Sequence, residues 1–169
     1  QWGPRMAAAG AGGFVVVWTS GEQDGSDDGV YGQRFDASGN RLGSEFRVNS
    51  YTTGAQNGAA VAADGAGNFI VVWRSAGQDG SGWGVFAQRY DADGNLLGGE
   101  FQVNQSTTGD QDAPAVAAGP DGRFVVTWQS AGQDGSGLGV FASILSSGVF
   151  SDGFEQGDAV HAGHLEVGH

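Results

Sequence analysis

Apolar residues recur along this chain in short runs that repeat at a fixed distance. Three bulky runs, FVVVW, FIVVW and FVVTW, are each followed by a Gly/Asp/Ser-rich stretch. The tryptophans that close these runs lie 55 residues apart, at Trp18, Trp73 and Trp128. A fixed period of this size is typical of repeat architectures, in which each repeat is one structural unit. We therefore expect the polar stretches to be part of a repeated fold before they are anything else, and the three tryptophans to lie in the core.

The second unit shows the expected elements most clearly. Residues 59–63 are a run of small apolar side chains, and residues 69–75 are β-branched and aromatic, which is typical of a buried strand. Residues 84–91 alternate, so that Val85, Ala87 and Arg89 share one face while Phe86, Gln88 and Tyr90 share the other. Residues 100–104 form a last short strand, and Gly/Asn turns separate the elements. The pattern predicts four short antiparallel strands per unit and almost no helix.

Four such strands per repeat indicate an all-β fold of β-propeller type with three four-stranded blades. The first strand of each unit is built of small residues, as expected next to a crowded axis, and the last is the most polar, as expected at the outside. We expect one repeat domain over residues 1–151, with units at about 3–57, 58–112 and 113–151. Residues 152–169 form a C-terminal tail.

The third unit departs from the pattern. Arg34 and Arg89 of the first two units give way to Ile144, and a tight SSG turn leads into residues 149–154, which we expect to form a shortened fourth strand. Terminal repeats are often atypical. Here the end is more apolar, which predicts self-assembly through Ile144, Leu145, Val149 and Phe150.

The stretch NFIVVWRSAGQDGSGWGVFAQRYDADGNLLGGEFQVN resembles tandem repeats of large secreted or surface-attached bacterial proteins, including adhesin-like ones. The likeness covers most of residues 4–144. It implies a secreted, extracellular or cell-surface location and says little about activity. The tail FSDGFEQGD is similar to a short motif near the C-termini of secreted bacterial proteins, although Ala159 and Val160 follow here in place of the usual tryptophan.

The net charge of the chain indicates which partners it does not bind. The chain has 7 basic and 19 acidic residues, with a net charge of −12, and a surface of this sign repels nucleic acid and anionic lipid. No run approaches the roughly 20 apolar residues of a membrane helix, so we expect no membrane insertion. Cysteine is absent, which rules out disulfides.

The repeated loops are the first candidates for ligand binding. Equivalent positions would form a ring of polar groups for a sugar or a cation, at Gln23, Asp24, Gln78, Asp79, Gln133 and Asp134. Trp83 stands beside the second loop and is suited to stacking on a sugar ring. The alternative is structural, since Gly supplies unusual backbone angles and Asp and Ser bond their own backbone in turns.

Calcium needs about six to eight oxygen ligands, more than one loop supplies. The first loop is the best candidate because Asp27 and Asp28 follow Asp24. The turn DADGN, with Asp91, Asp93 and Asn95, resembles the start of a calcium loop, but a hairpin turn is the alternative. We expect no required cofactor, with Ca²⁺ as a possible ligand. The tail histidines His161, His164 and His169 are spaced for a metal but lack a firm scaffold.

Enzyme chemistry finds little support. The repeats contain no Cys, Lys or His, and the repeated acids occupy equivalent positions, whereas catalytic carboxylate pairs need different environments. The first hypothesis is a non-enzymatic extracellular structural or adhesion protein that assembles with itself head-to-tail into a ring or filament. The alternative is a multivalent module that binds cell-surface glycans through the repeated loops.

Overall fold

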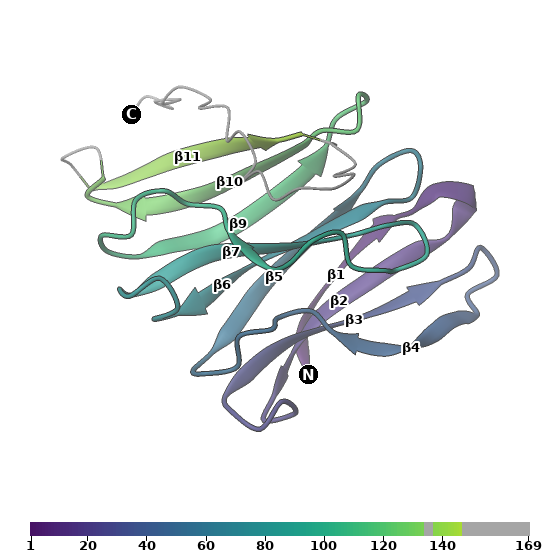
Figure 1. The fold of residues 1–169 in the computed structure, drawn as a ribbon, viewed down its shortest axis with the longest axis horizontal. Helices are drawn as coiled ribbons and strands as arrows, with labels where there is room; N and C mark the ends of the chain where they lie inside the picture. Colours follow the sequence, from purple (N-terminus) through teal and green to yellow (C-terminus); the bar gives the residue numbers. More distant parts are fainter. Residues whose placement is uncertain (134–136, 147–169) are drawn as a thin grey trace.

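The computed structural model describes residues 1–133 and 137–146, and this part of the chain is all-β (Figure 1). The strands are β1 (Trp2–Ala8), β2 (Phe14–Gly21), β3 (Asp28–Phe35), β4 (Arg41–Arg47), β5 (Gln56–Ala63), β6 (Phe69–Ala76), β7 (Trp83–Tyr90), β8 (Phe101–Gln102), β9 (Gln111–Ala118), β10 (Phe124–Ala131) and β11 (Leu138–Leu145). Within the described ranges, the helical structure is limited to the three-residue 3-10 turn η1 (Gly10–Gly12). No helix there is long and apolar enough to cross a membrane.

The strands form three separate antiparallel sheets, one for each repeat. Blade 1 contains β1 to β4, blade 2 contains β5 to β8 and blade 3 contains β9 to β11, and strands that follow one another in the chain are neighbours in the sheet. This up-and-down order is that of a propeller blade. Four strands are confirmed for the first two blades, whereas blade 3 shows three in the described residues. The shortened fourth strand expected at 149–154 lies outside them.

The blades stack face to face, with blade 2 between the other two (Figure 1). The first strands lie together along the stack, because β5 contacts both β1 and β9. Small residues such as Gly58, Ala59 and Ala60 let these strands approach closely. The prediction that the first strand of each unit lies innermost agrees with these contacts.

Blade 2 is buried on both faces because its strands are apolar on successive residues. Along β6, Phe69, Val71 and Trp73 pack in the cluster shared with blade 1, while Ile70 and Val72 pack in the cluster shared with blade 3. The alternation predicted for β7 is also found. Phe86 and Tyr90 belong to the first cluster, and Val85 and Ala87 belong to the second.

The end blades bury only one face well. In β2, Val15 and Val17 are buried against blade 2, whereas the alternating residues Phe14, Val16 and Trp18 are only partly buried. In β10, Val126 and Trp128 are buried against blade 2, whereas Gln129 on the opposite face is exposed. The core prediction is therefore confirmed for Trp73 and Trp128 but was too strong for Trp18, which has no blade on its outer side within the described residues.

Candidate functional site

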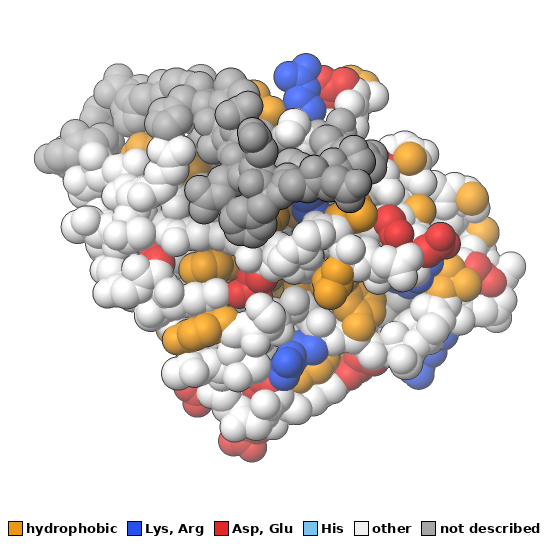
Figure 2. All heavy atoms as spheres, in the orientation of Figure 1, with side chains coloured by type: hydrophobic (Ala, Val, Ile, Leu, Met, Phe, Trp, Pro, Cys, Tyr) orange, Lys and Arg blue, Asp and Glu red, His pale blue; other side chains and the backbone are white. Residues whose placement is uncertain are grey.

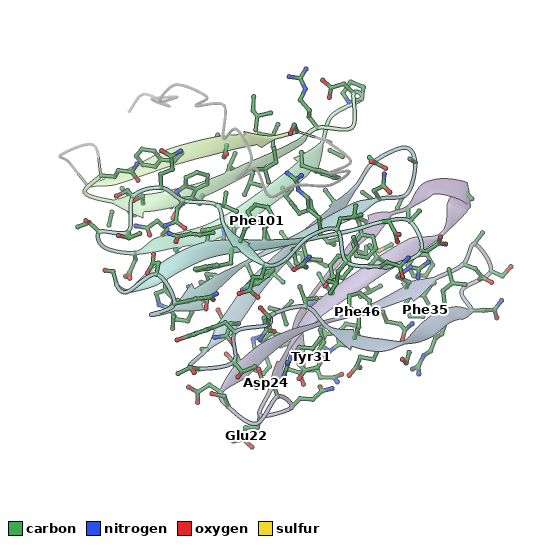
Figure 3. The ribbon with its side chains drawn as sticks, in the orientation of Figure 1. Glu22, Asp24, Tyr31, Phe35, Phe46 and Phe101 are labelled. Carbon is green, nitrogen blue, oxygen red and sulfur yellow. The ribbon has the colours of Figure 1, made fainter. Side chains whose placement is uncertain are left out.

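The Asp of the first repeated loop is used within the fold. Asp24 accepts a hydrogen bond from the Ser26 amide at 3.2 Å and one from the Asn49 side chain at 3.4 Å. Its carboxylate lies over Gly29, where a Cβ would come within 2.8 Å of Asp24 Oδ2. Figure 3 shows Asp24 near Tyr31, and burial together with the Asp24 charge raises the pKa of the Tyr31 hydroxyl.

The second loop repeats this geometry residue by residue. Asp79 accepts from the Ser81 amide at 3.1 Å and from the Asn104 side chain at 3.5 Å. A Cβ on Gly84 would come within 2.6 Å of Asp79 Oδ2. The aspartate therefore leaves room only for glycine at the second residue of the third strand, which is Gly29 in β3 and Gly84 in β7.

The glutamines of these loops are also engaged. Gln23 donates to Glu45, and Gln78 donates to Glu100 at 2.5 Å. Glu100 in turn accepts from the amide and hydroxyl of Ser50, which belongs to the connection out of blade 1. In both loops, the amide group expected to contact a ligand instead ties the loop to the outer part of its own blade.

The third loop is only partly described. Gln133 is exposed, and Asp134 lies outside the described residues. The tail histidines also lie outside them, so the structure gives no account of these positions.

A buried polar link that sequence reasoning missed joins consecutive blades. Asn49 accepts from the Val30 amide at 2.7 Å and donates to Gln56 Oε1 at 3.2 Å, which connects the end of blade 1 to the first strand of blade 2. Asn104 accepts from the Val85 amide at 2.7 Å and donates to Gln111 Oε1 at 2.8 Å. The signal was present in the sequence, because both residue types recur at the 55-residue period.

A second missed group crosses all three blades. Arg74 of β6 donates through Nε to Asn57 at 2.6 Å and through Nη1 to both carboxylate oxygens of Asp112 at 2.8 Å. Asn57 donates in turn to Asp28 at 2.9 Å. Asp28 lies in blade 1 and Asp112 in blade 3, so one arginine links the blades on either side of its own.

Trp83 occupies a different place from the one predicted. It is the first residue of β7 rather than part of the loop, and it is half-buried. The Arg74 guanidinium lies 4.4 Å from the centroid of the Trp83 ring. The Trp83 backbone amide donates to Asp110 at 3.0 Å. One face of the indole is therefore already covered by a cation.

The DADGN sequence forms a turn in which its polar residues bond each other. Asp91 accepts from the Asn95 amide and from the Asn95 side chain, both at 2.8 Å, and these bonds lower the pKa of the Asp91 carboxyl. Asp36 and Asn40 repeat the arrangement in blade 1. Asp93 is exposed, and its carbonyl accepts from Arg34 of blade 1. The geometry is that of the hairpin alternative.

Metal-ligating groups do not gather in the part of the chain that the structure describes. No three His, Cys, Asp or Glu residues lie close enough there to hold an ion together. Asp27 is exposed, while Asp28 is half-buried and bonded to Asn57. Figure 2 shows acidic side chains at separate places on the visible face rather than in one cluster. Calcium binding therefore stays a prediction of the sequence.

The four residues expected to mediate self-assembly have different positions. Ile144 is half-buried. Leu145 is 8% exposed and packs in the cluster between blades 2 and 3, so its assignment to an assembly surface was wrong: β11 turns this side chain inward. Val149 and Phe150 lie outside the described residues.

No protein-family model matches the chain, and no curated protein matches it. Its fold is similar to several solved structures. These include the endo-arabinase from Bacteroides thetaiotaomicron, with a TM-score of 0.53 and 15% identity over 86% of this chain and 56% of that one. Hadza microbial sialidase Hz136 has a TM-score of 0.59 and 11% identity over 83% and 34% of the two chains. A protein of unknown function from Dyadobacter fermentans has a TM-score of 0.61 and 10% identity over 86% and 51%.

The chain thus spans between one third and little more than half of the length of these three proteins. At these identities the likeness concerns the fold alone. Together with the blade order and the face-to-face stack, it shows that the chain has a propeller-type all-β fold.

Proposed function

We propose that the chain is a non-enzymatic, extracellular structural or adhesion module whose blades assemble head-to-tail with those of further copies, in a ring or a filament. The observation that carries the proposal is the contrast between blade 2, buried on both faces, and the end blades. Phe14, Val16 and Trp18 are partly buried, while their counterparts in blade 2 are fully enclosed. Extended apolar faces of this kind mark interaction surfaces.

The repeated loops support a structural role. The described side chains expected to bind a ligand, Gln23, Asp24, Gln78 and Asp79, all form hydrogen bonds inside the fold. A loop whose polar groups are already paired must break those bonds before it binds anything else. The recurrence of the loop is thus explained by the blade it closes.

The extracellular location rests on the resemblance to repeats of secreted and surface-attached bacterial proteins. A net charge of −12 favours solubility of such a module, while the exposed ends give it a place to meet another copy. Two exposed faces at opposite ends of one chain make a heterologous contact, which closes into a ring or continues as a filament.

The test is the size of the native particle. Light scattering on the untagged chain across a concentration series, with electron microscopy of the same samples, should give multiples of 17.2 kDa. Met6→Glu is the matched variant, because Met6 is 65% exposed on β1 and a charge there should prevent assembly without unfolding blade 1. A folded wild-type chain that stays at 17.2 kDa throughout would contradict the proposal.

A second candidate function is carbohydrate binding at the junction of blades 2 and 3. The observation that favours it is the half-buried Trp83, which lies beside Arg74 and Asp110 with part of its indole in solvent. Aromatic rings with adjacent polar groups suit sugar rings. A glycan array tests this candidate. It is supported if the chain binds a glycan, free sugar competes with that binding and Trp83→Ala abolishes it. It is rejected if the chain binds no glycan.

A further inference from the structure

The outer face of blade 1 has the composition of a face that is buried elsewhere in the same molecule. Blade 2 meets blade 1 with Val61, Phe69, Val71, Trp73, Phe86 and Tyr90, which all belong to one core cluster. The residues 55 positions earlier are Met6, Phe14, Val16, Trp18, Tyr31 and Phe35. All six positions are apolar in both blades, so the outer face of blade 1 repeats a face that the molecule already uses for blade packing. On this outer face Met6 is 65% exposed, whereas Tyr31 is 6% exposed.

The outer face of blade 3 repeats the opposite half of the same interface. Blade 2 meets blade 3 with Ala62, Ile70, Val72, Val85 and Ala87. The residues 55 positions later are Ala117, Val125, Thr127, Val140 and Ala142, four of them apolar. Val140 is 42% exposed. The two ends of the described chain are therefore the two complementary halves of the junction that stacks the blades.

One pair of equivalent positions distinguishes the ends from the internal junctions. At the junction of blades 1 and 2, Asn57 donates to Asp28 at 2.9 Å. At the next junction the equivalents are Trp83 and Asp112, which Arg74 joins by covering the indole and bonding the carboxylate. Both internal junctions are therefore held here by polar or charged groups.

At the two ends this pair becomes apolar on both sides at once. The equivalents are Leu138, 73% exposed at the start of β11, and Trp2, 49% exposed at the start of β1. Each is among the exposed large apolar side chains of the described residues. If only one member of the pair were apolar, a leucine would face an asparagine or a tryptophan would face an aspartate, and the polar side chain would be buried without a partner. When leucine faces tryptophan, no polar side chain is buried unpaired.

We propose that the partner of the blade 1 face is blade 3 of a second copy, with Leu138 of one copy packed on Trp2 of the next, in the register that Asp28 and Asn57 have inside the chain. This rests on the proposed head-to-tail assembly and names its contact. The second copy is favoured over an unrelated protein because both halves of the interface, and both members of the matched pair, are present on every copy.

Exchange of the pair for its polar equivalent gives a selective test. Trp2→Asn and Leu138→Asp each introduce the residue found at the junction of blades 1 and 2, and each alone creates a mismatch between identical copies. We expect each single variant to need about tenfold or more higher concentration for half-assembly than the wild type. Light scattering measures this, and thermal melting of dilute samples checks that the exposed substitutions leave the fold intact.

Mixing the two single variants should restore assembly. When the two variants alternate along the assembly, every junction contains either the Leu–Trp pair of the wild type or an Asp–Asn pair. No junction then places an apolar side chain against a polar one. The double variant Trp2→Asn/Leu138→Asp should also assemble by itself, which keeps the test decisive if one single variant folds poorly. Lys or Arg is not introduced at any position, so the acidic surface changes by one charge at most.

The outcomes separate this inference from the proposed function. If the wild type stays monomeric, whether because another protein or the chain's own residues 147–169 occupy these faces, the head-to-tail assembly itself fails. If the wild type assembles and both single variants assemble equally well, only the Leu138–Trp2 contact is wrong. Single variants that are impaired but not rescued by mixing or by the double variant would also overturn the pairing.

Discussion

Strands β2 and β6 have almost the same sequence, FVVVW against FIVVW, yet they are buried differently. In β6 all five residues from Phe69 to Trp73 are buried. In β2 the alternate residues Phe14, Val16 and Trp18 are only partly buried. The strands occupy equivalent positions in their blades, so the difference lies in the neighbours. Among the described residues, β6 has a blade on both sides and β2 has a blade on one side. Each repeat has apolar residues on both faces of its sheet. The number of neighbouring blades decides whether one face or both are buried.

The largest expected difference in stability between the two strands comes from removing their equivalent tryptophans. We expect Trp73→Ala to lower the free energy of unfolding by about 3–5 kcal/mol, because it empties an enclosed site. Trp18→Ala should cost about half as much in dilute solution. Both indole nitrogens lack a hydrogen-bond partner, so the pair compares packing alone. Denaturant titration measures both values, and equal losses would contradict the assigned difference in burial.

The difference between the two tryptophan variants should depend on protein concentration. If a second copy covers Trp18, the cost of Trp18→Ala should rise toward that of Trp73→Ala as the wild type assembles, because binding to the native state adds to its stability. Trp73→Ala is the control. Its site is already enclosed within one chain, so the stability that it loses should not change with protein concentration.

The buried link between blades should give the next largest effect. Asn104→Ala leaves the Val85 amide and Gln111 without their partner in a buried site, which costs roughly 1–3 kcal/mol. Asn95→Ala is the matched control, since Asn95 lies in an exposed turn. Thermal or denaturant unfolding measures the stability loss of each variant. If Asn95→Ala loses as much stability as Asn104→Ala, the buried link between the blades contributes no more than an exposed turn.

Trp83→Ala should have a smaller effect than Trp73→Ala despite the identical substitution. The indole is half-buried, and its contact with the Arg74 guanidinium is worth about 0.5–2 kcal/mol. We expect Trp83→Ala to lower the free energy of unfolding by about 1 kcal/mol in the same denaturant titration. A loss as large as that of Trp73→Ala would mean that the blade 2–3 junction depends on this ring.

The smallest expected effect is a pH dependence of the hairpin turns. Hydrogen bonds from Asn95 lower the pKa of Asp91 below the ordinary value of about 3.9. A lowered native pKa gives stability that is present above that ordinary value and is lost as the pH falls through the native one. Asp91→Ser should therefore flatten the decline in melting temperature below about pH 4, whereas Asp93→Ser should not. If the wild type, Asp91→Ser and Asp93→Ser have the same melting temperature at every pH, the Asp91 turn does not contribute to the pH dependence.

The 55-residue period was sufficient to predict much of the fold. The period-2 alternation placed Val85 and Ala87 on one side of β7 and Phe86 and Tyr90 on the other, as found. Local patterns succeed here because each strand is buried by its own repeat and the one beside it. The same reasoning overestimated the burial of Trp18, since a local pattern does not say which repeat stands at the end of a stack.

The candidate site was harder to predict, because the partners of polar groups lie far away in the sequence. Asp24 was expected to face a ligand, but its partner Asn49 is 25 residues away. Arg74 reaches Asp112 across 38 residues. Asn and Gln occur both in turns and in buried hydrogen bonds, so their residue type alone does not distinguish the two roles. Leu145 was assigned to the surface because the sequence alone does not fix which face of β11 meets blade 2.

If the outer faces of blades 1 and 3 are the two halves of one interface, cysteines at the matched positions 2 and 138 should form a disulfide between copies. The chain has no cysteine, so Trp2→Cys/Leu138→Cys introduces the only two thiols. The internal pair Asp28→Cys/Asn57→Cys is the positive control for the same register within one chain. After mild oxidation we expect the control to stay at monomer mass with a closed disulfide and the end pair to give covalent multimers in a non-reducing gel. If the end-pair chain stays monomeric while the control forms its disulfide, Leu138 and Trp2 do not meet between copies.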